Sequence, residues 1–189
     1  MSDLSLALDS PPAGARDSVG NSDTRARALV NDHFDFVWRL LRRLGIPEAD
    51  ADDAAQQVFI VGTRRLADIL LGNERTFLYG AALRVASTMR RNSARRARFI
   101  RSVPTESDTS LRTPHDELER HLALALLDQL LSSLDDDQRA IFVLCEIEEL
   151  TAPQVAAIVN IPVGTVASRL RRARHSFGAE LKRLKAQGT

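Results

Sequence analysis

The chain has 189 residues, enough for one ordinary domain or two small ones. Hydrophobic residues make up 44% of it and aromatic residues only 5%, which favours helices packed through aliphatic side chains. No apolar stretch approaches the roughly 20 residues that a membrane-spanning helix needs. The single cysteine, Cys145, excludes an intrachain disulfide and indicates a reducing compartment.

The formal net charge of +1 conceals an uneven distribution of charged side chains. Residues 84–101 contain seven arginines and no acid, and residues 169–185 contain seven lysines or arginines against one glutamate. Acidic residues gather instead at 48–53, 106–119, 135–137 and 146–149. Two separate basic blocks indicate a polyanion that is contacted at two places.

The N-terminal half of the chain shows three successive helical periods. Residues 1–23 are rich in Pro, Gly, Ser and Asp and are predicted to form a disordered leader. Beyond them, "GIP" at 45–47 and "LGNER" at 71–75 separate the helical segments. The apolar positions of the three periods are Val30, Phe34, Val37, Leu41 and Leu44, then Ala54, Val58, Val61, Leu66 and Ile69, then Leu78, Ala81, Val85 and Met89. We expect them to form one small bundle over residues 24–98.

The C-terminal half contains a second group of helical patterns after a linker predicted at residues 99–117. Leucines recur every four residues from Leu118 to Leu134, and "DDDQ" then opens a helix that carries Ile141, Leu144 and Ile147. "LTAPQVAAIV" is a short helix with Thr151 as its N-cap and Pro153 in its first turn. The sequence therefore predicts an all-α fold of two small helical domains joined by a flexible linker, the second covering residues 118–185.

The end of the second domain has the layout of a helix-turn-helix. Asn160 suits the left-handed conformation of the turn, and Pro162 prevents the first helix from continuing. At 100° per residue, the buried face of the last helix would consist of Val163, Val166, Leu170, Ala173 and Phe177. The opposite face and its flanks carry Gly164, Thr165, Ser168, Arg169, Arg171, Arg172, Arg174 and His175.

This last helix is predicted to lie in a DNA groove. Its outward residues near the N-terminus would meet base edges, because arginine suits guanine O6 and N7, while Arg169 and Arg174 would meet phosphates. Gly164 would permit close approach of the backbone to DNA. A solvated basic face on an ordinary core helix is the alternative interpretation.

The segment "LDDDQRAIFVLCEIEELTAPQVAAIVNIPVGTVASRLRRAR" resembles the promoter −35-binding domain of extracytoplasmic-function (ECF) sigma factors, members of the sigma-70 family of bacterial RNA polymerase. The resemblance implies that Ser168, Arg171 and Arg172 meet the −35 element. Ala167 departs from the family, which often has Lys or Arg there.

The N-terminal half extends the resemblance. "DADDAAQQVF" resembles the family helix that docks on the β′ clamp of the polymerase, which implies docking through Asp50, Asp52, Asp53, Gln56 and Gln57. "FLYGAALRVASTMRR" resembles the helix that melts and binds the −10 element, with Phe77 in place of a Trp. Thr63, Arg84 and Thr88 are further departures from the family. The expected −10 contacts are Tyr79, Arg84, Arg90, Arg91 and Arg95, with Arg96 and Arg98 as further phosphate contacts, while Phe77 either stacks on a base or packs in the core.

The resemblance predicts a sigma factor that directs core RNA polymerase to promoters by −10 and −35 recognition. The implied partners are core polymerase (β′ clamp and β flap), promoter DNA and an anti-sigma factor, with no membrane insertion and no cofactor, in the cytoplasm. A stand-alone helix-turn-helix regulator is the alternative. An enzyme is not predicted, because the four histidines are scattered and no Gly-rich phosphate loop or metal-ligand spacing is present.

Overall fold

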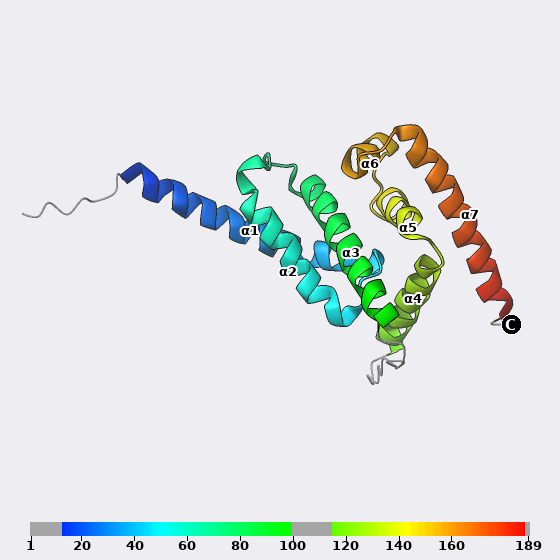
Figure 1. Ribbon diagram of the computed structural model, residues 1–189. Helices are drawn as coiled ribbons and strands as arrows, with labels where there is room; N and C mark the ends of the chain where they lie inside the picture. Colours follow the sequence, from blue (N-terminus) through cyan, green and yellow to red (C-terminus); the bar gives the residue numbers. More distant parts are fainter. Residues whose placement is uncertain (1–12, 100–114, 188–189) are drawn as a thin grey trace, which may run out of the picture.

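The computed structural model describes residues 13–99 and 115–187, and every regular element within these ranges is helical (Figure 1). The N-terminal unit consists of α1 (Ala13–Arg43), α2 (Glu48–Arg64), the short 3-10 turn η1 (Leu66–Asp68) and α3 (Glu74–Phe99). The C-terminal unit consists of α4 (His115–Ser132), α5 (Asp136–Phe142), the π-helical turn η2 (Val143–Ile147), α6 (Ala152–Val159) and α7 (Val163–Gln187). The predicted all-α fold with two helical units is confirmed.

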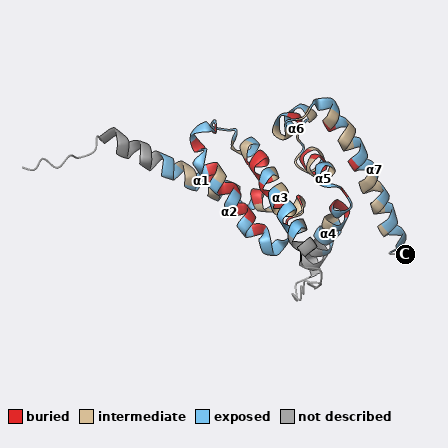
Figure 2. Cartoon of the chain, in the orientation of Figure 1, coloured by how far each residue is buried: buried red, intermediate tan, exposed pale blue. Residues whose placement is uncertain are grey.

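The core of the N-terminal unit follows the predicted helical spacing except at Phe34, which is 38% exposed (Figure 2). Val37 and Leu41 of α1 and Leu44, just after its end, are completely buried, and they pack in one core with residues of α2 and α3. The α2 side of this core includes Ala51, Ala54 and Ala55, small side chains that let helices approach closely. Gly45, at φ +90°, makes the turn between α1 and α2, a conformation that favours glycine.

The C-terminal unit has its own fully buried side chains. They come from every helix of the unit and include Leu131, Ile141, Leu144, Val155, Val166 and Ala173. Leu170 and Phe177 of α7 pack against this core from its edge. α7 therefore lies on α5 and α6 through one apolar face, as the helical wheel of its sequence indicates.

Two helix boundaries differ from those expected. α1 begins at Ala13, inside the segment predicted to be a disordered leader, because once its buried part has formed each further residue adds a hydrogen bond and no proline follows Pro12 until Pro47. α2 ends at Arg64 rather than near Ile69. Leu66 and Ile69 are nevertheless buried, through the 3-10 turn and the extended residue that follows it.

The predicted leucine ladder of α4 is only half buried. Leu130 and Leu134 lie in the core, whereas Leu122 is 61% and Leu126 41% exposed. The regular spacing of the leucines thus does not correspond to one continuous buried face, because in the described part of the chain only the C-terminal half of α4 packs on other elements. Most of the predicted linker, residues 100–114, lies outside the described residues.

The two units lie against each other. α3 contacts α6, and α1 contacts α4. In Figure 1, α3 lies between α2 and the C-terminal unit, and α7 forms the far side of the molecule. The face of α3 that is turned toward the C-terminal unit therefore forms part of the contact between the two units.

Candidate nucleic-acid interface

The turn between α6 and α7 has the geometry that its sequence predicts. Asn160 is left-handed, at φ 58° and ψ 51°, and ends α6. The carbonyl of Pro162 accepts hydrogen bonds from the backbone N–H groups of Thr165 and Val166, which starts α7. At the other end of α6, the N–H of Thr151 donates to Gln154 Oε1 at 2.9 Å. α6 and α7 thus form a helix-turn-helix.

The inner face of α7 is fixed by the core. Val166 and Ala173 are fully buried, and the ring of Phe177 stacks on that of Phe142 with centroids 4.6 Å apart. The expectation that Val163 belongs to this face is wrong, since it is 45% exposed. Val163 is the first residue of the helix, where no preceding turn covers it.

The outer face of α7 carries the predicted DNA contacts. Gly164, Arg171, Arg172, Arg174 and His175 are exposed, and Thr165, Ser168 and Arg169 are partly exposed. Ser168 donates its hydroxyl to the carbonyl of Thr165 at 3.0 Å. Arg171, Arg172 and His175 form no hydrogen bond or ion pair with any residue that the structure describes. These side chains are available to an external ligand.

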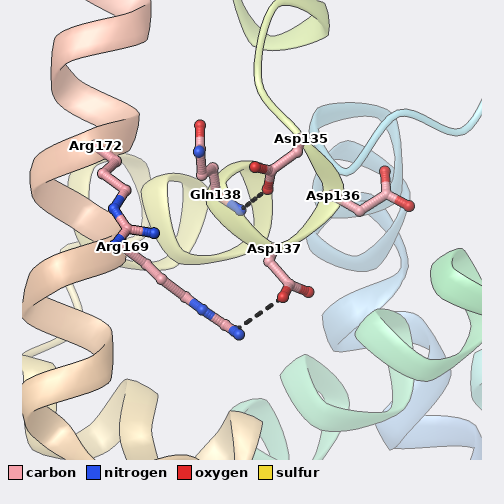
Figure 3. A pocket seen from close by; sticks show the side chains of 6 residues that line it. All are labelled: Asp135, Asp136, Asp137, Gln138, Arg169 and Arg172. Atoms are coloured by element: carbon pink, nitrogen blue, oxygen red, sulfur yellow. Dashed lines mark hydrogen bonds and ion pairs between the residues drawn. The ribbon is translucent and has the colours of Figure 1, made fainter.

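The two arginines that flank this face are paired within the C-terminal unit. Arg169 forms an ion pair with Asp137 at 3.0 Å, beside Arg172, in a shallow hollow next to the start of α5 (Figure 3). Arg174 lies 2.6 Å from Glu146. The sequence showed both acidic runs, but their pairing with α7 depends on tertiary contacts that spacing alone does not reveal. Each arginine would have to exchange a carboxylate for a phosphate on binding DNA.

The acidic surface predicted for polymerase docking lies on the outside of α2. All five residues of this surface are exposed: Asp50, Asp52, Asp53, Gln56 and Gln57. Asp52 also accepts a hydrogen bond from Trp38 Nε1 at 2.9 Å, so one of the carboxylates ties α2 to α1.

The predicted −10 residues divide into two groups. Arg84, Arg91 and Arg95 are exposed on α3. Tyr79 is only 4% exposed and its ring meets Phe36 edge-on, so the expected contact of Tyr79 with the −10 element is not met in this arrangement. The side chains of Arg96 and Arg98 lie outside the described residues.

Arg90 is also turned inward. Its guanidinium donates to the carbonyl of Leu44 and lies 3.1 Å from Asp136 in the C-terminal unit. The prediction that Arg90 contacts promoter phosphate is therefore not met in this arrangement. Phe77 is partly buried against the core, with the guanidinium of Arg65 5.8 Å from its ring centre.

Glu148 is a functional candidate that sequence reasoning missed. It lies just after η2, and its side chain is only 7% exposed. Arg43 donates to one carboxylate oxygen at 2.6 Å and the hydroxyl of Tyr79 to the other at 3.0 Å. Burial, together with the charge of Glu148, raises the pKa of Tyr79 to about 12, so this hydroxyl remains a donor. The only sequence signal for this site was the acidic run at 146–149.

Metal-binding clusters and membrane-spanning helices are both absent from the described residues. Within residues 13–99 and 115–187, no group of three or more His, Cys, Asp or Glu side chains could hold a metal ion. No helix in the described part of the chain is both long and apolar enough to cross a bilayer.

The helix-turn-helix, whose outer-face residues Arg171 and Arg172 pair with no described residue, places the chain in the class of helical DNA-binding proteins. Comparisons with known proteins narrow this class. Residues 124–176 match the family model described as "Sigma-70, region 4". The RNA polymerase sigma-E factor of Streptomyces avermitilis is 32% identical over 163 residues, which cover 81% of this chain and 83% of that protein.

Other relatives agree. The ECF RNA polymerase sigma factor SigE of Mycolicibacterium smegmatis is 32% identical over 154 residues, 79% of this chain but 58% of the longer relative. The solved structure of CnrH in complex with the cytosolic domain of CnrY is 26% identical, with a TM-score of 0.60 over 85% of this chain and 94% of that one. The chain therefore belongs to the ECF group of the sigma-70 family of RNA polymerase sigma factors.

Proposed function

We propose that this sigma factor binds the −35 element through α7 and core RNA polymerase through α2. The observation that carries the first part is the outer face of α7, where Arg171, Arg172 and His175 have no partner among the described residues. The buried Val166 and Ala173 fix the opposite face, so the rotation of the helix about its axis is set. A recognition helix in the major groove reads bases through such outward residues.

The roles of individual residues on α7 follow from their positions. Arg171 and Arg172 would donate to guanine O6 and N7, and Ser168 would contact a base edge or the backbone. Gly164 has no atom within 4 Å of where a Cβ would lie, so the backbone there is open to close approach by DNA. Arg169 and Arg174, held near the flanks by their carboxylates, would bind phosphates with little sequence preference.

The N-terminal unit, predicted over residues 24–98, would dock on polymerase through the acidic surface of α2. Asp50, Asp53 and Gln57 are exposed on one helix, where they suit a basic partner. Promoter phosphates at the −10 region would then be met by Arg84, Arg91 and Arg95. In this proposal the chain is a non-catalytic polymerase subunit acting in the cytoplasm. An anti-sigma partner is consistent with the CnrH–CnrY complex.

The proposed −35 contacts can be tested by substituting each arginine separately. Arg171→Ala and Arg172→Ala should each weaken binding to the cognate duplex by about 1–3 kcal/mol if each reads a base. Lys182→Ala, on the exposed C-terminal part of the same helix, is the matched control and should have little effect. The measurement is a fluorescence anisotropy titration on cognate and scrambled duplexes. An equal loss on both duplexes would show that the arginines contact phosphate only.

A further inference from the structure

Glu148 is a buried charge whose partners all lie in the other unit. The three groups around its carboxylate are Arg43 at 2.6 Å, the Tyr79 hydroxyl at 3.0 Å and Arg75 at 3.8 Å. Arg43 belongs to α1, and the other two belong to α3. A buried carboxylate is costly unless it is paired and hydrogen-bonded. When the units are together, the N-terminal unit supplies this pairing, and when they part, water must replace it.

The geometry around Glu148 makes the contact specific. Glu148 follows the π-helical turn η2, and Glu149 after it is left-handed, at φ 56°. On the other side, the ring of Phe36 lies under the guanidinium of Arg75, 4.4 Å away, and edge-on to Tyr79. Both sides of the contact are thus positioned before they meet, which lowers the entropy cost of forming it.

Two further ion pairs join the same two units. Arg42 of α1 lies 2.9 Å from Asp128 of α4, and Arg90 of α3 lies 3.1 Å from Asp136 at the start of α5. In every case the N-terminal unit supplies the cation and the C-terminal unit the anion. Asp128, Asp136 and Glu148 thus offset part of the positive charge that the N-terminal unit would offer to DNA.

The contact between the units also engages two of the residues predicted to meet the −10 element, Tyr79 and Arg90, while Arg84, Arg91 and Arg95 stay exposed. A groove runs between the two units, and its lining includes Ile69, Leu70, Phe77, Arg84, Ala157 and Ile158. Arg84 therefore shares this groove with α6 of the helix-turn-helix. Tyr79 and Arg90 are engaged by Glu148 and Asp136. A DNA strand that is to contact Tyr79 or Arg90 would have to displace the C-terminal unit.

We infer that the contact of Glu148 with Arg43, Arg75 and Tyr79 is a latch that holds the two units in a closed, autoinhibited arrangement, in which the C-terminal unit masks Tyr79 and Arg90 on the −10-binding face of α3. The inference deepens the proposed function, on which its DNA-binding part rests. Polymerase and promoter would act on the open form, whose population the latch controls.

The latch can be tested by measuring the distance between the units in solution. Spin labels at Ala67→Cys and Ala179→Cys, both exposed, would report that distance by double electron–electron resonance in a Cys145→Ser background. Glu148→Gln keeps the shape of the side chain but removes its charge. Glu149→Gln makes the same charge change at an exposed neighbour that pairs with no residue in the described ranges.

Glu148→Gln should add or enlarge a long-distance population, and Glu149→Gln should leave the distribution unchanged. Tyr79→Phe, which removes one hydroxyl and keeps the ring, should give a smaller shift in the same direction and guards against a folding defect in Glu148→Gln. Unchanged distances in both variants would overturn the latch, as would an equal shift in Glu149→Gln.

A second measurement separates the latch from the proposed function. Binding of a single-stranded oligonucleotide of −10 sequence by the full chain should tighten about fivefold in Glu148→Gln, because a larger fraction of molecules is open. Opening without any gain in affinity, where the wild type does bind, would overturn the masking of α3. Opening with no binding by either protein would overturn −10 binding by α3 while leaving the latch in place.

Discussion

Tyr79 is the residue whose environment departs most from the sequence-based expectation. The chain has one tyrosine, so its ionisation can be followed directly by ultraviolet absorbance. Burial and then the charge of Glu148 raise the pKa of Tyr79 to about 12 from its ordinary value of 10.0. Native protein should therefore show a phenolate midpoint near 12, and urea-unfolded protein one near 10.

The same shift predicts how stability depends on pH. Because the folded pKa of Tyr79 is raised, its contribution to the free energy of unfolding is fully present below pH 10 and is lost as pH rises toward 12. Urea denaturation across this range should show a steeper loss for wild type than for Tyr79→Phe, which has no titrating hydroxyl. Equal slopes, or a native midpoint near the ordinary value of tyrosine, would place this hydroxyl in solvent and contradict the contact with Glu148.

At the scale of the element, α7 makes the sharpest prediction because two of its valines have opposite environments. Val166 is fully buried, whereas Val163 is 45% exposed. Val166→Ala should lower the free energy of unfolding by about 1–3 kcal/mol through lost burial and the cavity left behind. Val163→Ala should change it by less than about 0.5 kcal/mol. Urea denaturation followed by circular dichroism measures both, and a comparable loss in the two variants would mean that α7 is rotated about its axis.

Local signals were sufficient to predict most elements. The helix-turn-helix followed from the spacing of apolar residues and from Asn160 and Pro162, whose backbone preferences act within a few residues. Helical spacing alone could not show which apolar positions find a partner. Val163 and Leu122 have the right spacing, but the structure leaves both exposed: Val163 is the first residue of α7, and Leu122 lies in the N-terminal half of α4, away from the core.

Contacts between distant residues were not predictable from spacing. Glu148 and Arg43 are 105 residues apart, and no local sequence pattern around either residue indicates that the two form a pair. The same holds for Arg169 with Asp137 and for Arg90 with Asp136. The acidic and basic runs are visible in the sequence. Only the packing of the helices shows which of these charges form ion pairs and which remain available to a ligand.

At the scale of the whole molecule, separate charged surfaces are proposed to bind DNA, to join the two units and to bind polymerase. On the outer face of α7, Arg171 and Arg172 pair with no described residue, while four arginines of the N-terminal unit contact carboxylates of the C-terminal unit: Arg42, Arg43, Arg75 and Arg90. The acidic surface of α2 is separate from that contact and stays exposed. The molecule could thus bind polymerase through α2 before the two units part.

The central claim is that this chain is a sigma factor that docks on core polymerase through α2, and co-purification with core RNA polymerase tests it most directly. The charges of Asp50 and Asp53 are the ones to reverse. Asp52 is left unchanged because it also accepts a hydrogen bond from Trp38. The double variant Asp50→Lys/Asp53→Lys should lose the β and β′ subunits that wild type retains. Asp32→Lys/Asp35→Lys, an equal charge change on exposed residues of α1, should retain them. Retention of polymerase by the α2 variant would contradict docking through α2, and absence of polymerase from the wild type would contradict the sigma-factor function itself.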